Sequence, residues 1–143
     1  MATTTAGFSI SSNDLLTNSL AFSQQKTLTQ AGVTTGIKGS TGLAAKTFAS
    51  TSNVILIDAN AEGMFATGSG HEKIYIKNTS TSSTQYVQVL LGTIEIGRLY
   101  GGDWLFMPTC LGSDDFDDDG GGTDIEVTPS TTESVTLEYM VLY

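Results

Sequence analysis

Short segments in which apolar and polar residues alternate fill the second half of the chain. Apolar side chains at every second position indicate β-strands with one buried face. Four segments carry the pattern, 72–78, 85–91, 124–128 and 134–143, and the apolar segment 103–108 lies among them. Gly, Ser, Thr or Pro residues separate them, and the apolar run NVILIDA precedes them. The pattern predicts an all-β fold, a single antiparallel β-sandwich or jelly-roll-like domain over residues 53–143.

The alternation also predicts which side chains face the core. The expected inward set is Ile74, Ile76, Val87, Val89, Leu91, Ile125, Val127, Val135, Leu137, Tyr139, Val141 and Tyr143. Segment 103–108 is apolar on both faces, and we expect Trp104 and Phe106 to pack in the core. The polar turn TSTSST predicts a hairpin that pairs the strands before and after it. Gly92, at a change of phase, predicts a bulge or a sharp bend.

Residues 1–52 are rich in Thr, Ser, Ala and Gly and show no clean period. The stretch NDLLTNSLAFSQQ fits either a short helix capped by Ser12 or Asn13 or an extended strand. We expect this part of the chain to form an extended N-terminal arm with one or two short strands, ordered by a neighbouring molecule.

The net charge of −9 is concentrated towards the end of the chain. Residues 1–98 hold five acidic and six basic residues, whereas residues 99–143 hold ten acidic residues and no basic one. A negative field repels phosphate backbones, so we expect no nucleic-acid binding and favour a basic patch on a partner protein. The N-terminus lacks a signal-peptide pattern, and no apolar run approaches about 18 residues, the length of a membrane span. We therefore expect a soluble protein made in a cytoplasm, without membrane contact.

Catalytic chemistry has little support in the sequence. Cys110 is the only cysteine, which excludes an intrachain disulfide, and His71 is the only histidine. We interpret Cys110 as a small buried residue and His71 as a surface or turn residue. Asp58 and Glu62 have the residue types of a glycosidase pair but lie on one loop, where carboxylates are usually solvated. We therefore expect a non-enzymatic protein.

The segment SDDFDDDGGGTDIE contains seven acidic residues. From its third residue it fits the spacing of a calcium loop, in which carboxylates at alternate positions converge on one cation. Asp115, Asp117, Asp119 and Glu126 would supply the carboxylate ligands. Loops of this kind lie between helices, whereas here a strand is predicted to follow. The alternative is a solvated hairpin tip whose carboxylates prevent pairing of the sheet edge.

The segment KIYIKNTSTSSTQYVQVLLGTIEIGRLYGGDWLFMP resembles a pattern in small structural proteins of tailed bacteriophages, notably phages of marine and cyanobacterial hosts. In that pattern a strand and a polar turn precede an IGRLY–GGD–aromatic hairpin and a strand that ends in Pro. The resemblance covers residues 72–108, with a looser match in the closing TLEYMVLY, and the Asp-rich insert 114–119 departs from it.

The resemblance implies a virion component. It implies a decoration or cement protein that binds the major capsid protein, or a minor head or tail protein, and a homo-oligomer. A receptor- or carbohydrate-binding module at a tail or fibre is the main alternative. The aromatic residues that would serve it near Gly-rich turns are Tyr100, Trp104, Phe106 and Phe116. A fragment of a calcium-dependent hydrolase is a second alternative.

Overall fold

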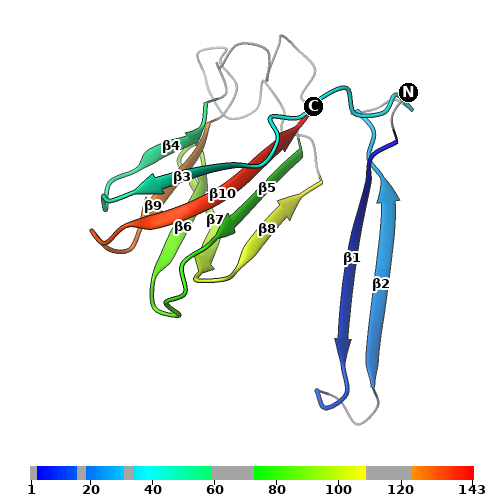
Figure 1. Cartoon of the computed structure of the whole chain (residues 1–143), viewed down its shortest axis with the longest axis horizontal. Coiled ribbons are helices and arrows are strands. Elements are labelled where there is room, and N and C mark those ends of the chain that lie inside the picture. Colours follow the sequence, from blue (N-terminus) through cyan, green and yellow to red (C-terminus); the bar gives the residue numbers. More distant parts are fainter. Residues whose placement is uncertain (1–2, 16–18, 31–33, 59–72, 109–123) are drawn as a thin grey trace. The chain divides into compact units, whose positions relative to one another are not determined.

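In a computed structural model of the chain, the described residues are 3–15, 19–30, 34–58, 73–108 and 124–143 (Figure 1). They form ten β-strands and no helix. The chain divides into two compact units, Met1–Lys38 and Gly39–Tyr143. The prediction of an all-β fold is confirmed.

The first unit contains an antiparallel pair of strands, β1 (Thr5–Ser12) and β2 (Leu20–Thr27), in which Ile10 lies opposite Phe22. The strand alternative for this segment is therefore correct over residues 20–25, and the helix alternative is wrong there. The Ser12 hydroxyl accepts a hydrogen bond from the backbone N–H of Leu15 at 3.1 Å. Ser12 thus makes the contact of a helix cap, but the chain beside it follows a turn.

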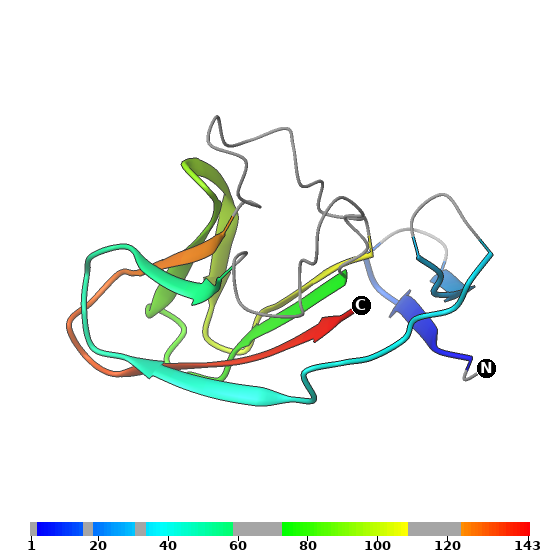
Figure 2. The ribbon, with the colours of Figure 1, turned by 90° about the horizontal axis from the view of Figure 1, so that it is seen from above.

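The second unit is a sandwich of two four-stranded antiparallel sheets. The first sheet has the order β3 (Ala44–Phe48), β10 (Val135–Leu142), β5 (Lys73–Asn78), β8 (Trp104–Met107). The second sheet has the order β4 (Val54–Ile57), β9 (Ile125–Pro129), β6 (Tyr86–Leu91), β7 (Ile94–Tyr100). Seen from above, red β10 and orange β9 lie in different layers (Figure 2).

The order of the strands along the chain identifies the sandwich as a jelly roll. Successive strands from β3 to β10 change sheets at every step except between β6 and β7, and each sheet interleaves early and late strands. This connectivity is that of a two-sheet jelly roll built from Greek keys. The strand β3 belongs to the first sheet, so the sandwich begins earlier along the chain than residue 53, where the sequence analysis placed it.

The core lies between the two sheets and consists mainly of β-branched residues and leucine. The predicted inward residues that are at most 1% exposed are Ile74, Ile76, Val87, Val89, Ile125, Val127, Val135, Leu137 and Val141. The prediction for Trp104 is wrong, because its side chain is 51% exposed. Its neighbour Leu105 and the residue Met107 pack against the core instead.

The predicted hairpin between the strands on either side of TSTSST is also wrong. The strand β5 pairs with β10 and β8, whereas β6 pairs with β7 and β9 in the other sheet. The polar turn therefore crosses from one sheet to the other. The expected irregularity at Gly92 is present as a turn between β6 and β7, in which Gly92 has φ of +57°. The register of β6 with β7 also shifts between Val89 and Leu90, which indicates a bulge.

Candidate binding surfaces

A buried asparagine connects β5 in the first sheet to β7 in the second. Asn78, at the end of β5, is 0% exposed. Its side-chain amide donates hydrogen bonds to the backbone carbonyls of Leu99 at 3.0 Å and Gln85 at 3.3 Å, and its side-chain oxygen accepts one from the N–H of Ser80 at 3.0 Å. One side chain thus joins the connection between β5 and β6 to the strand β7.

The turn from β7 to β8 completes this arrangement. The backbone of Asn78 donates to the carbonyl of Asp103 at 3.0 Å and accepts from the N–H of Gly102 at 2.9 Å. Gly102 has φ of +91°, a conformation that favours glycine. A Cβ on Gly101 would lie 2.3 Å from the backbone oxygen of Ser82. Gly101 is therefore required by the close packing of these two connections, and Gly102 by its positive φ.

The outward face of the first sheet carries large apolar side chains. Across its strands, Tyr75 lies opposite Phe106 on one side and Met140 on the other, and Lys77 lies opposite Trp104. We call Tyr75, Trp104, Phe106 and Met140 the outer aromatic face. Trp104 is 51% exposed, and the other three are partly buried. Exposed aromatic residues with apolar neighbours are typical of protein–protein contact sites.

The outward face of the second sheet carries a cluster of tyrosines and charged groups, which we call the tyrosine cluster. The rings of Tyr86 and Tyr100 lie 5.2 Å apart, and the guanidinium of Arg98 lies 4.9 Å from the centre of the Tyr86 ring. Glu95 accepts hydrogen bonds from Arg98 at 3.2 Å and from Gln88 at 3.0 Å. The hydrogen bond to Glu95, together with the proximity of Tyr86, raises the pKa of Arg98 above its ordinary value.

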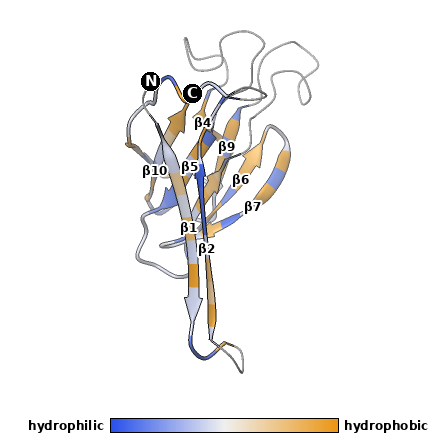
Figure 3. Cartoon of the chain, turned by 90° about the vertical axis from the view of Figure 1, so that its right-hand side faces the viewer, coloured by the Kyte–Doolittle hydropathy of each residue, from blue (hydrophilic) through white to orange (hydrophobic). Residues whose placement is uncertain are grey.

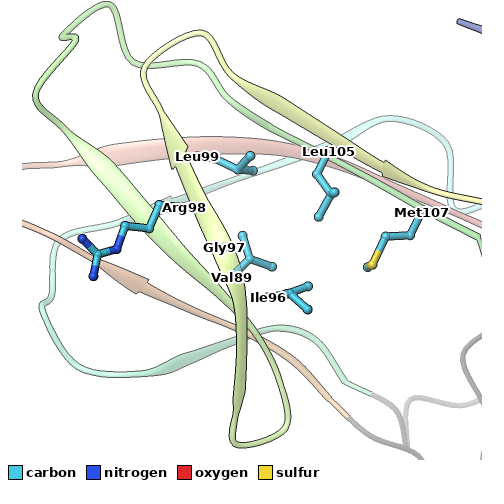
Figure 4. Close-up of a pocket in the computed structure, with 7 residues that line it drawn as sticks. All are labelled: Val89, Ile96, Gly97, Arg98, Leu99, Leu105 and Met107. Atoms are coloured by element: carbon cyan, nitrogen blue, oxygen red, sulfur yellow. The ribbon is translucent and has the colours of Figure 1, made fainter.

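An apolar groove runs between the edge strands β7 and β8 (Figure 4). Its volume is about 380 Å³, and its lining residues are Val89, Ile96, Gly97, Arg98, Leu99, Leu105 and Met107. Among the described residues that line it, Arg98 alone is charged. We call this feature the edge groove.

Of the predicted calcium ligands, only Glu126 lies among the described residues. It lies on β9 opposite Ile55 and Leu90, and its carboxylate accepts a hydrogen bond from Asn53 at 3.1 Å. Asp115, Asp117 and Asp119 lie outside the described residues. Within the described ranges no group of three or more His, Cys, Asp or Glu residues could hold a metal ion. The calcium site stays a prediction.

Four of the other residues singled out from the sequence also lie outside the described ranges, namely Glu62, His71, Cys110 and Phe116. Asp58 follows β4 and is exposed. Tyr100 and Trp104, 41% and 51% exposed, lie on the outward faces of different sheets. The predicted aromatic group is therefore divided between two surfaces.

Sequence reasoning missed the tyrosine cluster and the edge groove. Tyr86 and Gln88 alternate on one strand, as Arg98 and Tyr100 do on the next, so the sequence shows that each pair shares a face. It does not show that the two strands are neighbours. The edge groove is formed by strands of different sheets, for which the sequence carries no local signal.

Comparisons of the chain with protein-family models, with curated proteins and with solved structures found no match. None of the described residues forms a helix of the length and apolar character that a membrane span requires. The class of the protein is given by its fold alone, an antiparallel β-sandwich with jelly-roll connectivity.

Proposed function

We propose that the protein is a non-enzymatic structural component of a bacteriophage virion. Its role is that of a decoration or cement protein, which binds the major capsid protein and stabilises the shell. It is made in the cytoplasm of the host and is incorporated into the particle there. The proposal combines the resemblance of residues 72–108 to phage structural proteins with the surfaces that this segment forms.

The observation that carries the proposal is the outer aromatic face. It lies on a sheet whose other side packs on the core. Its exposed tryptophan, Trp104, and the partly buried Phe106 lie two residues apart on β8 and therefore share this face. Trp and Tyr are enriched among the residues that dominate protein–protein affinity. A sheet face with such residues fits a broad protein surface better than it fits a small ligand, which is bound in a concave site.

Charge complements the aromatic contact. Residues 99–143 contain ten acidic residues and no basic one, and Asp103, Glu133 and Glu138 lie in the described part of the sandwich. The excess of acidic groups attracts a basic partner surface, which raises the association rate and fixes the orientation of docking. A shell protein with a basic outer patch would therefore be bound in one orientation.

The first test is a binding experiment with purified shells and the variant Trp104→Ala. Because truncation of a central aromatic residue costs about 2 kcal/mol or more, we expect the affinity to fall by roughly thirtyfold. Ile55→Ala is the matched control, since Ile55 is 41% exposed on the second sheet and lies outside the outer aromatic face. Equal affinities of Trp104→Ala and the unmodified protein would contradict the proposed contact.

The second test is a cryo-electron microscopy reconstruction of the particle that contains the chain. Hundreds of copies in contact with the shell, with the outer aromatic face at the contact, are expected. A position at the tail alone, in a handful of copies, would refute the decoration role.

The tyrosine cluster favours one alternative function, that of a carbohydrate-binding module at a tail or fibre. Aromatic rings stack on the apolar faces of sugars, and the carboxylate and amide of Glu95 and Gln88 have the hydrogen-bonding groups that sugar hydroxyls need. Binding on a glycan array that Tyr100→Ala abolishes and Trp104→Ala preserves would favour this alternative over the decoration role.

A further inference from the structure

The edge groove opens one side of the sandwich. The strand β7 pairs only with β6 and β8 only with β5 among the described strands, so no described strand pairs with the outer edge of either. Leu105 and Met107 belong to the core yet are only partly buried, and Ile96 is 45% exposed. A sheet edge beside an apolar groove accepts an extended segment with apolar side chains at alternate positions.

The first unit of the same chain offers a segment of this kind, the paired strands β1 and β2, which we call the ribbon. One face of the ribbon carries the apolar residues Phe8, Ile10, Leu20 and Phe22 together with Ala6, Ser12, Gln24 and Lys26, since Ile10 lies opposite Phe22 and Ser12 opposite Leu20. Hydrophobic and hydrophilic residues are both present along β1 and β2 (Figure 3). The other face carries Ser, Thr, Gly, Gln and Ala side chains. Ile10 is 44% and Phe22 45% exposed. A single two-stranded hairpin is only marginally stable in water, so further burial of its apolar face would stabilise it.

We propose that the ribbon of one copy lies in the edge groove of a second copy. Both surfaces carry large apolar side chains and few charges: Lys26 is the only charged residue of β1 and β2, and Arg98 is the only one among the residues that line the groove. The contact therefore removes few charges from water. The eight residues of each ribbon strand match the seven of β7, and the outer edges of the ribbon and of β7 can exchange backbone hydrogen bonds.

We take a second copy of the chain as the occupant of the edge groove. Each chain carries one ribbon and one edge groove, so copies that exchange ribbons leave no ribbon and no groove unoccupied. The contact joins two different surfaces, so it produces exchanged dimers or rings where the rotation between copies closes and open filaments where it does not. This inference does not depend on the proposed function, because self-association can be measured without a shell.

The test measures the mass of the full chain by size exclusion with light scattering. The unmodified protein is expected at twice its 15.0 kDa or at a higher multiple. Ile10→Glu places a charge on the apolar face of the ribbon, and Ile96→Glu places one in the groove. Each variant alone is expected to be monomeric. An equimolar mixture is expected at twice the monomer mass, because the intact ribbon of Ile96→Glu meets the intact groove of Ile10→Glu.

The controls place the same charge next to each site. Ser9→Glu lies on the polar face of β1, and Ile94→Glu lies on β7 outside the groove lining, where its side chain is 51% exposed. Both are expected to associate like the unmodified protein. A monomeric unmodified protein, which includes the case of a ribbon docked within its own copy, would overturn the inference. So would a monomeric mixture, or association of Ile96→Glu alone.

Discussion

The buried side chain of Asn78 allows a substitution that changes hydrogen-bonding chemistry at nearly constant shape. Asn78→Asp replaces the amide that donates to the carbonyls of Leu99 and Gln85 by an oxygen that cannot donate when ionised. Asn78→Ala removes the side chain beyond Cβ and is the matched variant without a titratable group. Both variants lack the amide, and only Asn78→Asp carries a carboxyl group.

The cost of Asn78→Ala follows from the groups that lose their partners. Of the three hydrogen bonds of the Asn78 side chain, only the one to the carbonyl of Leu99 is buried. A buried group left unpaired costs about 1–3 kcal/mol. The bonds to Gln85 and Ser80 are partly buried and contribute about 1 kcal/mol or less each. We therefore expect Asn78→Ala to lower the free energy of unfolding by roughly 3 kcal/mol, a large part of the total of about 5–15 kcal/mol for a domain.

Asn78→Asp adds a dependence on pH. Burial disfavours the charged carboxylate, and two carbonyl oxygens face it, so the pKa of this Asp in the folded protein rises above about 3.9, its value in the unfolded chain. A shift of about 3 units corresponds to roughly 4 kcal/mol. Because the folded state holds the proton more tightly, the variant is most stable below the unfolded pKa and loses stability as pH rises to the folded pKa.

The order of the two variants therefore reverses with pH. Near pH 4 the protonated Asp donates one hydrogen bond, so Asn78→Asp is expected to be more stable than Asn78→Ala. At pH 7 it is expected to be less stable. Urea unfolding followed by circular dichroism measures both, and the difference between the variants removes the contribution of the other carboxylates. The same order at both pH values would refute the assigned donor role of the Asn78 amide.

Two further predictions concern the glycine turn and the acidic segment. Gly101→Ala is expected to lower the free energy of unfolding by about 1–3 kcal/mol, because its Cβ would meet the backbone oxygens of Ser80 and Ser82, whereas Gly97→Ala, with nothing within 4 Å of its Cβ, is the control in the same urea experiment. An equal cost for both glycines would contradict the close approach of the two connections. Millimolar calcium is expected to raise the melting temperature in a saturable way, and Asp117→Asn to remove the rise; an unchanged melting curve of the unmodified protein would exclude the site.

The core could be predicted from the sequence because alternation identifies a face directly. Ile74 and Ile76 are separated by Tyr75, and only one of the two sets can be buried in a sheet with one apolar side. The same reasoning failed for Trp104. Its segment is apolar on both faces, so alternation groups Trp104 with Phe106 and Leu105 with Met107 but does not determine which pair faces the core.

Pairing between strands could not be predicted in the same way. The alternation of β5 and β6 is the same whether the strands are neighbours or lie in opposite sheets, and the polar turn between them is long enough for either arrangement. The tyrosine cluster and the edge groove depend on pairing, because Arg98 meets Tyr86 only if β6 and β7 are adjacent. These surfaces follow from topology, which local sequence patterns do not contain.

The place of β10 in the first sheet has a consequence for synthesis of the protein. This strand is the last of the sandwich along the chain, yet it lies between β3 and β5. Leu142 follows Phe48 by 94 residues. At about 5–20 residues per second, the ribosome completes β3 roughly 5–20 s before the strand that pairs with it. During this interval β3 lacks its partner in the native sheet and β5 lacks one of its two, which exposes the nascent chain to aggregation until β10 is made.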